Sequence, residues 1–178
     1  MELIRQRRPV TMPEVAKAAM VSEATAYRYF PDLASLLSQA LAADWPTPAH
    51  ALAPVEASID PVERVAFATR FLLEGIAQRQ AVVRSIISAT ITQPELAGSA
   101  RPGIRFGLIE HALSPFLAAL ESADPYLPTQ LRRDLAIVLS AEALFSLTDL
   151  CGLSTKDAID SAEKTARSLT AFAFNQIS

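Results

Sequence analysis

The chain has 178 residues, of which 51% are hydrophobic and 20% are charged. Such a composition can bury a hydrophobic core, which excludes an intrinsically disordered protein. The net charge of −3 argues against a protein that coats nucleic acid along its whole length, and the single cysteine excludes an intramolecular disulfide framework.

Three short helices are predicted in the first 45 residues, because residues that cap helix N-termini precede three apolar runs. These capping residues are Thr11, Ser22 and Asp32. The first helix has Glu14 as its capping-box partner and extends to about residue 19, the second ends after Phe30, and the third ends near Asp44.

A larger helical region is predicted after a proline-rich connection over residues 45–60. Helices are expected over 61–80, 82–91, 104–121 with a kink at Pro115, 127–151, and from 154 to the C-terminus. Strand signals are absent. The sequence therefore predicts an all-α fold, with an N-terminal three-helix module over residues 1–45 that contains a helix-turn-helix, and a larger C-terminal domain over residues 46–178.

The second predicted helix, residues 23–30, has two different faces. Ala26 and Phe30 share one face, which suits burial, whereas Thr25 and Arg28 point the other way. A three-residue turn, 20–22, joins it to the preceding helix, as in a DNA-reading helix-turn-helix. A pair of packed helices without a DNA-binding role would show the same local pattern.

If this helix enters a major groove, its small and polar groups lie over base edges and its two tyrosines reach phosphates. The candidate DNA-binding residues are Thr11, Ser22, Glu23, Ala24, Thr25, Tyr27, Arg28 and Tyr29. Residues 1–30 carry five basic and three acidic side chains, whereas residues 31–178 carry 11 basic and 16 acidic ones. A positive segment on an acidic body is typical of a nucleic-acid-binding module attached to another domain.

The full pattern resembles the DNA-binding region of the tetracycline-repressor (TetR) family, over residues 1 to about 45. The residues that carry the resemblance are Thr11, Val15, Ala16, Ala19, Val21, Ser22, Thr25, Tyr27, Tyr29, Phe30, Pro31, Asp32, Leu36 and Leu37. The resemblance implies an all-helical homodimer that binds a pseudo-palindromic double-stranded DNA operator. It also implies a C-terminal domain that binds a small-molecule effector and then releases the DNA, with repression as the common mode.

Three features depart from the family pattern. Met20 stands where the turn usually has glycine, and Leu33 stands where a phosphate-contacting lysine is common. The family's first helix usually begins a turn or two earlier, after a basic arm, so the sequence from Met1 onward is expected to start inside that helix. We expect fewer cationic contacts to the DNA backbone as a result.

Aromatic and polar residues of the larger region are candidates for the effector site. Phe67 and Phe71 lie on a polar helix face, which either a covering helix or a ligand cavity would explain. Arg105 lies in an apolar arc, where it could meet an anionic effector or pair with a carboxylate. The candidate ligand-binding residues are Phe67, Phe71, Arg105, Phe106, Phe116, Glu142, Phe145 and Asp149.

The C-terminal helix carries a narrow apolar seam at spacings of three and four. Its residues are Ile159, Ala162, Ala166, Leu169 and Ala173. Packing within the chain and packing between two subunits explain this seam equally well. The family resemblance favours a two-fold homodimer interface made by the last two helices.

Other classes of function are less consistent with the sequence. No glycine-rich phosphate loop, metal-spaced His/Cys set or nucleophile–base set occurs, so we expect no enzyme, no cofactor and no metal site. The remaining alternative is a DNA-binding regulator that responds to a protein partner, or to nothing. Because neither a signal peptide nor an uncharged apolar run of 18 residues occurs, we expect a cytoplasmic protein with no membrane contact.

Overall fold

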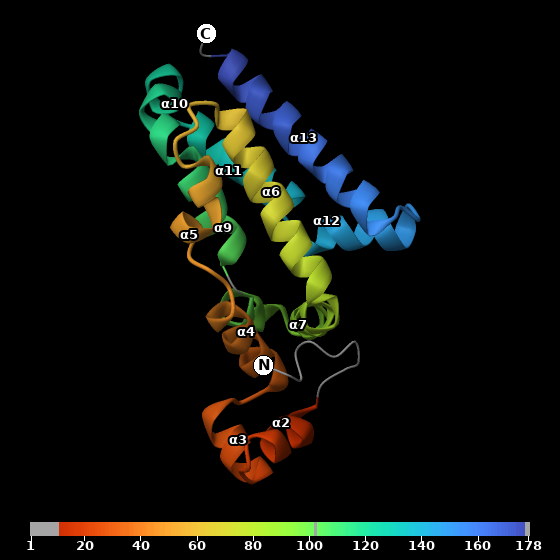
Figure 1. Cartoon of the computed structure of the whole chain (residues 1–178). Helices are drawn as coiled ribbons and strands as arrows, with labels where there is room; N and C mark the ends of the chain where they lie inside the picture. The colour runs from red at the N-terminus through yellow and green to blue at the C-terminus, as the bar shows by residue number, and fades with distance from the viewer. Residues whose placement is uncertain (1–10, 102, 177–178) are drawn as a thin grey trace. The chain divides into compact units, whose positions relative to one another are not determined.

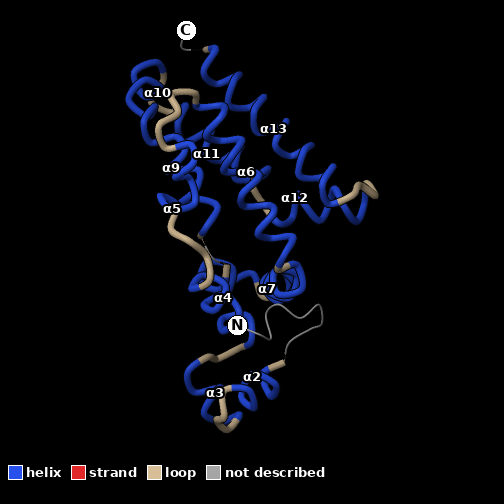
Figure 2. The backbone as a smooth tube through the Cα atoms, in the orientation of Figure 1, coloured by secondary structure: helices blue, strands red, loops and turns tan. Residues whose placement is uncertain are grey.

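The computed structural model describes residues 11–101 and 103–176, and the helix expected from Met1 onward lies outside these ranges. No strand occurs within them, and the prediction of an all-α protein is confirmed (Figures 1 and 2). None of the helices that the structure describes combines the length and apolarity needed to cross a membrane.

The α-helices differ widely in length, from 4 to 21 residues. In chain order they are α2 (Met12–Ala18), α3 (Glu23–Tyr29), α4 (Leu33–Ala43), α5 (Pro48–Leu52), α6 (Pro61–Gln78), α7 (Gln80–Thr92), α8 (Ala97–Ala100), α9 (Ile104–Leu113), α10 (Leu117–Ala123), α11 (Leu127–Val138), α12 (Ala141–Phe145) and α13 (Thr155–Asn175). Short 3₁₀ turns occupy Ala53–Val55, Pro94–Leu96 and Ser114–Phe116, and a π-helical turn occupies Ser146–Leu150.

The long helix predicted over residues 127–151 is broken at Ser140, which the sequence analysis did not predict. Ser140 is extended and caps α12, since its hydroxyl accepts the N–H of Ala143 at 3.0 Å and donates to the carbonyl of Ile137 at 2.7 Å. A serine that bonds to the neighbouring backbone competes with helix continuation. Pro115 interrupts the 104–121 segment as expected, and Gly152, directly after the predicted 127–151 helix, has a left-handed backbone, with φ +68°.

The chain divides into two compact units, which are described separately. Unit 1 comprises residues 1–45 and 78–102, and unit 2 comprises residues 46–77 and 103–178. The sequence predicts a single domain over residues 46–178. Residues 78–102 join unit 1 because α7 and α8 pack against α4. The Arg79 guanidinium contributes to this packing, donating to Asp44 Oδ2 at 2.8 Å and lying 5.1 Å from the ring centroid of Trp45.

A small core joins α2 and α3 within unit 1. Met12, Ala16 and Ala26 are buried there, and Phe30 and Leu36 pack against them. The turn after α2 is a Schellman motif: Val21 N–H donates to Ala16 at 3.0 Å and Met20 N–H donates to Lys17 at 3.1 Å. Met20 therefore occupies the left-handed position of the motif, with φ +56°, which is usually a glycine.

Unit 2 is a set of packed helices in which α11 contacts both α9 and α13, and α9 contacts α5 (Figure 1). One face of α6 is apolar and buried, including Val65, Leu72 and Leu73. The close approach of α5 and α9 depends on Gly107, because a Cβ there would lie 3.1 Å from Cγ of Pro48.

A fully buried arginine, Arg64, joins α6 to two other elements of unit 2. Its guanidinium donates to the carbonyls of Val55 and Glu56 at 2.9 and 2.7 Å, next to the first 3₁₀ turn. It also donates to His111 and Ala112 at 3.2 and 3.0 Å, in the last turn of α9. Val55 also accepts the N–H of Ser58 at 3.1 Å, and His111 also accepts the hydroxyl of Ser114 at 3.0 Å. The buried guanidinium therefore adds a donor to carbonyl groups of two separate segments and links them to α6.

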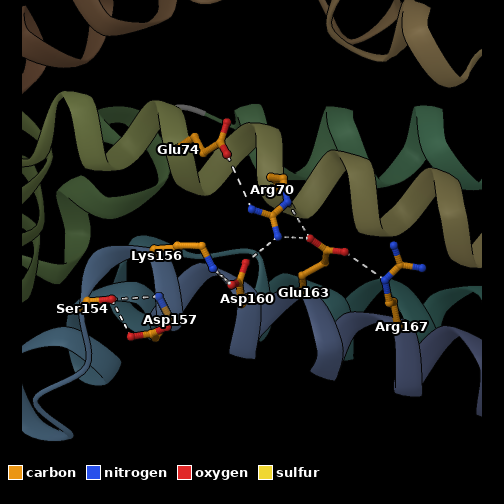
Figure 3. A network of polar contacts seen from close by, with 8 residues as sticks. All are labelled: Arg70, Glu74, Ser154, Lys156, Asp157, Asp160, Glu163 and Arg167. Carbon is orange, nitrogen blue, oxygen red and sulfur yellow. Dashed lines mark hydrogen bonds and ion pairs between the residues drawn. The ribbon is translucent and has the colours of Figure 1, made fainter.

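A second arginine, Arg70, connects α6 to α13 at the surface of unit 2 (Figure 3). It donates to Glu163 Oε2 at 2.7 Å and to Asp160 Oδ1 at 2.6 Å. Hydrogen bonds from Lys156 and from Arg70 lower the pKa of Asp160 from its ordinary value. A carboxylate with a lowered pKa stabilises the fold above that ordinary value, and this stabilisation is lost as the pH falls through the lower pKa of the folded state.

Replacing Arg64 with methionine tests the importance of the buried guanidinium. The variant Arg64→Met keeps an unbranched side chain but removes the guanidinium donor from four carbonyl groups, of which Val55 and His111 keep a second donor, from Ser58 N–H and the Ser114 hydroxyl. We expect the free energy of unfolding in urea to fall by about 3 kcal/mol, because each buried orphan group costs about 1–3 kcal/mol. The control Arg167→Met removes a half-exposed ion pair with Glu163 and should cost less than about 1 kcal/mol. Equal effects of the two substitutions would contradict the role assigned to Arg64.

Candidate nucleic-acid interface

Both helices of the helix-turn-helix, α2 and α3, are stabilised by side-chain hydrogen bonds that cap their N-termini. At α2, the N–H and the hydroxyl of Thr11 each donate to Glu14 Oε2 at 3.0 Å, so the predicted capping box is present. At α3, the hydroxyl of Ser22 accepts the N–H of Thr25 at 3.1 Å, and the two hydroxyl oxygens lie 2.8 Å apart. The first turn of α3 therefore presents two paired hydroxyls, both named in the sequence analysis as DNA contacts.

The two faces of α3 differ as the sequence predicts. Ala26 is buried and Phe30 is half-buried, so one face anchors the helix to α2. Tyr27 and Tyr29 have 51% and 68% of their surface exposed. The other exposed residues of the helix are Glu23, Ala24 and Arg28, and Thr25 is half-buried. Two tyrosines that each expose at least half of their surface are unusual on so short a helix, since aromatic rings prefer burial.

Arg28 and Tyr29 form one combined surface. The guanidinium carbon of Arg28 lies 5.2 Å from the ring centroid of Tyr29, and Nη2 lies 3.5 Å from the phenolic oxygen. The sequence predicts separate roles for these side chains, with Arg28 over the bases and Tyr29 on a phosphate. Stacking restricts the rotamers of the long arginine side chain, so less conformational entropy remains to be lost on binding.

The start of α4 offers no cation where the family often has lysine. Leu33 is half-buried there, and the carboxylate of Asp32 accepts the N–H and the hydroxyl of Ser35 at 2.7 and 2.9 Å. The exposed basic residues described in α2 and α3 are Lys17 and Arg28. This agrees with the expectation of fewer cationic contacts from the helix-turn-helix.

Three of the candidate ligand-binding residues lie together in unit 2. Arg105 Nη1 is 3.7 Å from Glu142 Oε2, and its guanidinium carbon is 5.1 Å from the ring centroid of Phe106. Arg132 approaches the same ring at 5.1 Å and pairs with Glu110 at 2.7 Å. Arg105 thus pairs with a carboxylate, and its contact with an effector stays a prediction.

The other candidate ligand-binding residues lie in different surroundings. Phe67, Phe71 and Phe145 are half-buried. Phe116 packs edge-to-face on Phe174 of α13, with ring centroids 5.7 Å apart. Asp149 is exposed in the π-helical turn and accepts the hydroxyl of Thr148 at 2.8 Å.

The interpretation of the α13 seam as a dimer interface is corrected by the fold. Four of its five residues are buried within the chain, and Leu169 is half-buried. The buried residues are Ile159, Ala162, Ala166 and Ala173. Their small side chains allow close packing against α11 of the same chain, so they are not available to a second subunit. The outward side of α13 carries Phe172, which is 67% exposed.

Comparison with known proteins agrees with this geometry. Residues 5–40 match the family model described as bacterial regulatory proteins, tetR family, and this range contains all of α2 and α3. No curated protein and no solved structure matches the chain. Residues 5–40 therefore carry a DNA-binding module of the tetR type of bacterial regulatory protein, and this match supports a DNA-binding transcriptional regulator.

Proposed function

We propose that the chain is a repressor that acts through binding alone. It binds a palindromic operator as a homodimer and releases the DNA when a small molecule binds to its larger helical region. The observation that carries the DNA-binding part is the exposed face of α3, where Tyr27, Arg28 and Tyr29 project next to the capped first turn. This combination suits a helix lying in the major groove, with phenols and a guanidinium directed to phosphates and base edges.

The charges of the two units support the same assignment. By sequence, unit 1 has 8 basic and 6 acidic residues, for a net charge of +2, whereas unit 2 has 8 basic and 13 acidic residues, for a net charge of −5. DNA attracts the positive unit and repels the negative one, which favours binding through unit 1.

The double variant Tyr27→Ala/Arg28→Ala tests whether α3 is the reading helix, that is, the helix that contacts the bases in the major groove. We expect the affinity for the operator to fall by about 100-fold or more, because base and phosphate contacts of this kind contribute about 1–3 kcal/mol each. Fluorescence anisotropy with a labelled operator at several salt concentrations measures the affinity, and the salt slope should also become shallower. The matched control Tyr126→Ala/Arg133→Ala removes an exposed tyrosine and an exposed arginine from unit 2. If the Tyr27/Arg28 variant binds as tightly as this control, α3 is not the reading helix.

The dimer part of the proposal rests on the outward sides of α11 and α13. These helices pack on each other, and they expose Ile137 and Phe172 respectively. Large apolar side chains on packed neighbouring helices suit a two-fold contact with a second copy, and a palindromic operator requires two reading helices related by such symmetry.

The substitution Phe172→Asp tests this interface. A charge at the centre of an apolar contact should weaken the dimer by at least about tenfold, because burying an unpaired carboxylate is costly. Size-exclusion chromatography with light scattering at decreasing protein concentration measures the change in mass. The control Ile59→Asp alters a residue that is 91% exposed in the loop before α6 and should leave the dimer intact. A dimer that dissociates equally with either substitution, or with neither, would exclude Phe172 from the interface.

The effector part of the proposal is supported by the group of Arg105, Phe106 and Glu142. Two charged side chains beside an aromatic ring could orient a polar aromatic or acidic small molecule by exchanging their mutual ion pair for contacts to the ligand. The alternative is a regulator controlled by a protein partner, or one without ligand control.

A thermal-shift screen of small hydrophobic molecules, acids included, separates these alternatives. A true effector should raise the melting temperature, since it binds only the folded protein, and should also lower operator affinity. The variant Arg105→Ala should lose at least about tenfold in affinity for such a compound. The control Arg133→Ala, which changes an exposed arginine of α11, should not. A screen without any shift would favour control by a protein partner.

A further inference from the structure

The backbone of Met20 is strained. Of the residues that the structure describes, Met20 is the one non-glycine with a positive φ, at +56°. A side chain with a Cβ is disfavoured in this left-handed conformation, whereas glycine adopts it without steric cost. The Schellman turn after α2 would therefore form more readily with glycine at position 20.

The side chain of Met20 does not offset this strain by packing. It is 92% exposed, so the rest of the described chain covers almost none of its apolar surface. A residue that strains the backbone and buries nothing does not stabilise the fold. Strained positions of this kind characteristically lie at functional sites, where the side chain has a role outside the packed core.

Met20 lies beside the end of α3 that would approach the bases. It is two residues before Ser22, the cap of α3, so its Cα is within about 7 Å of the start of that helix. The N-terminal end of a reading helix contacts base edges, and the 5-methyl group of thymine is the apolar feature of the major groove. Methionine has a flexible and polarisable side chain, which suits an apolar contact of this kind, and the neighbouring Val21 is also exposed.

We infer that Met20 contacts the 5-methyl group of a thymine in each operator half-site. It thereby adds a preference for thymine beside the bases that α3 reads. This inference rests on the proposed function, because it requires α3 to lie in the major groove. It assigns a specificity-determining role to the turn that precedes the reading helix.

The test compares thymine with deoxyuridine, which lacks only the methyl group. The operator is first identified with the full chain by selection from random duplexes. Each thymine is then replaced in turn by deoxyuridine, and affinities are measured for the unchanged chain and for Met20→Asn. Asparagine tolerates the left-handed backbone but has no apolar chain. In each half-site, we expect one position at which a single replacement weakens binding of the unchanged chain about fourfold. This factor corresponds to the free energy of one buried methyl group. Met20→Asn should show no further loss at that position.

Two further variants keep the result interpretable. Met20→Gly relieves the strain, so it should melt at or above the temperature of the unchanged chain while also losing the sensitivity to deoxyuridine. Ile59→Asn changes an equally exposed apolar residue in unit 2 and should keep that sensitivity. If both Met20 variants retain the same deoxyuridine sensitivity as the unchanged chain, or if the unchanged chain shows none, the inference is overturned while operator binding still supports the proposed function. If the unchanged chain selects no operator, both are overturned.

Discussion

The buried guanidinium of Arg64 is the constraint on which the arrangement of unit 2 depends. It is the one charged residue among the largest fully buried side chains of the described chain, and its hydrogen bonds go to two segments outside its own helix. Because the guanidinium is a buried donor to carbonyl groups of both segments, its hydrogen bonds favour the position in which α6 packs. Apolar burial along α6 brings the helices together, and Arg64 determines their register.

The sequence predicted most of the features that depend on neighbouring residues. The caps at Ser22 and Asp32 and the division of α3 into two faces follow from side chains only a few residues apart. The break at Ser140 and the grouping of residues 78–102 with unit 1 were missed. The first depends on a hydroxyl that competes with the helix, and the second depends on tertiary packing of α7 and α8 against α4.

The seam of α13 shows that a sequence pattern can indicate close helix packing without identifying the partner helix. The spacing of Ala162 and Ala166 indicates that another helix approaches closely, but it carries no information on which helix does so. The partner is α11 of the same chain. Arg64 did leave a signal in the sequence, since it shares a helical face with Ala68 and Leu72, and a cation in an apolar stripe needs buried acceptors. Its carbonyl partners could not be identified in advance, because they lie in other elements.

The grouping of α4 with α7 and α8 has a consequence for the modularity of this regulator. Its DNA-binding unit is discontinuous along the chain, and only residues 1–45 of it precede the first segment of unit 2. Recombination at residue 45, in a laboratory chimera or between genes, would separate Asp44 from Arg79 and remove the helices on which α4 packs. A transplantable unit would have to include the α7–α8 segment, so new specificity is more easily acquired by substitutions on α2 and α3 than by exchange of the whole N-terminal region.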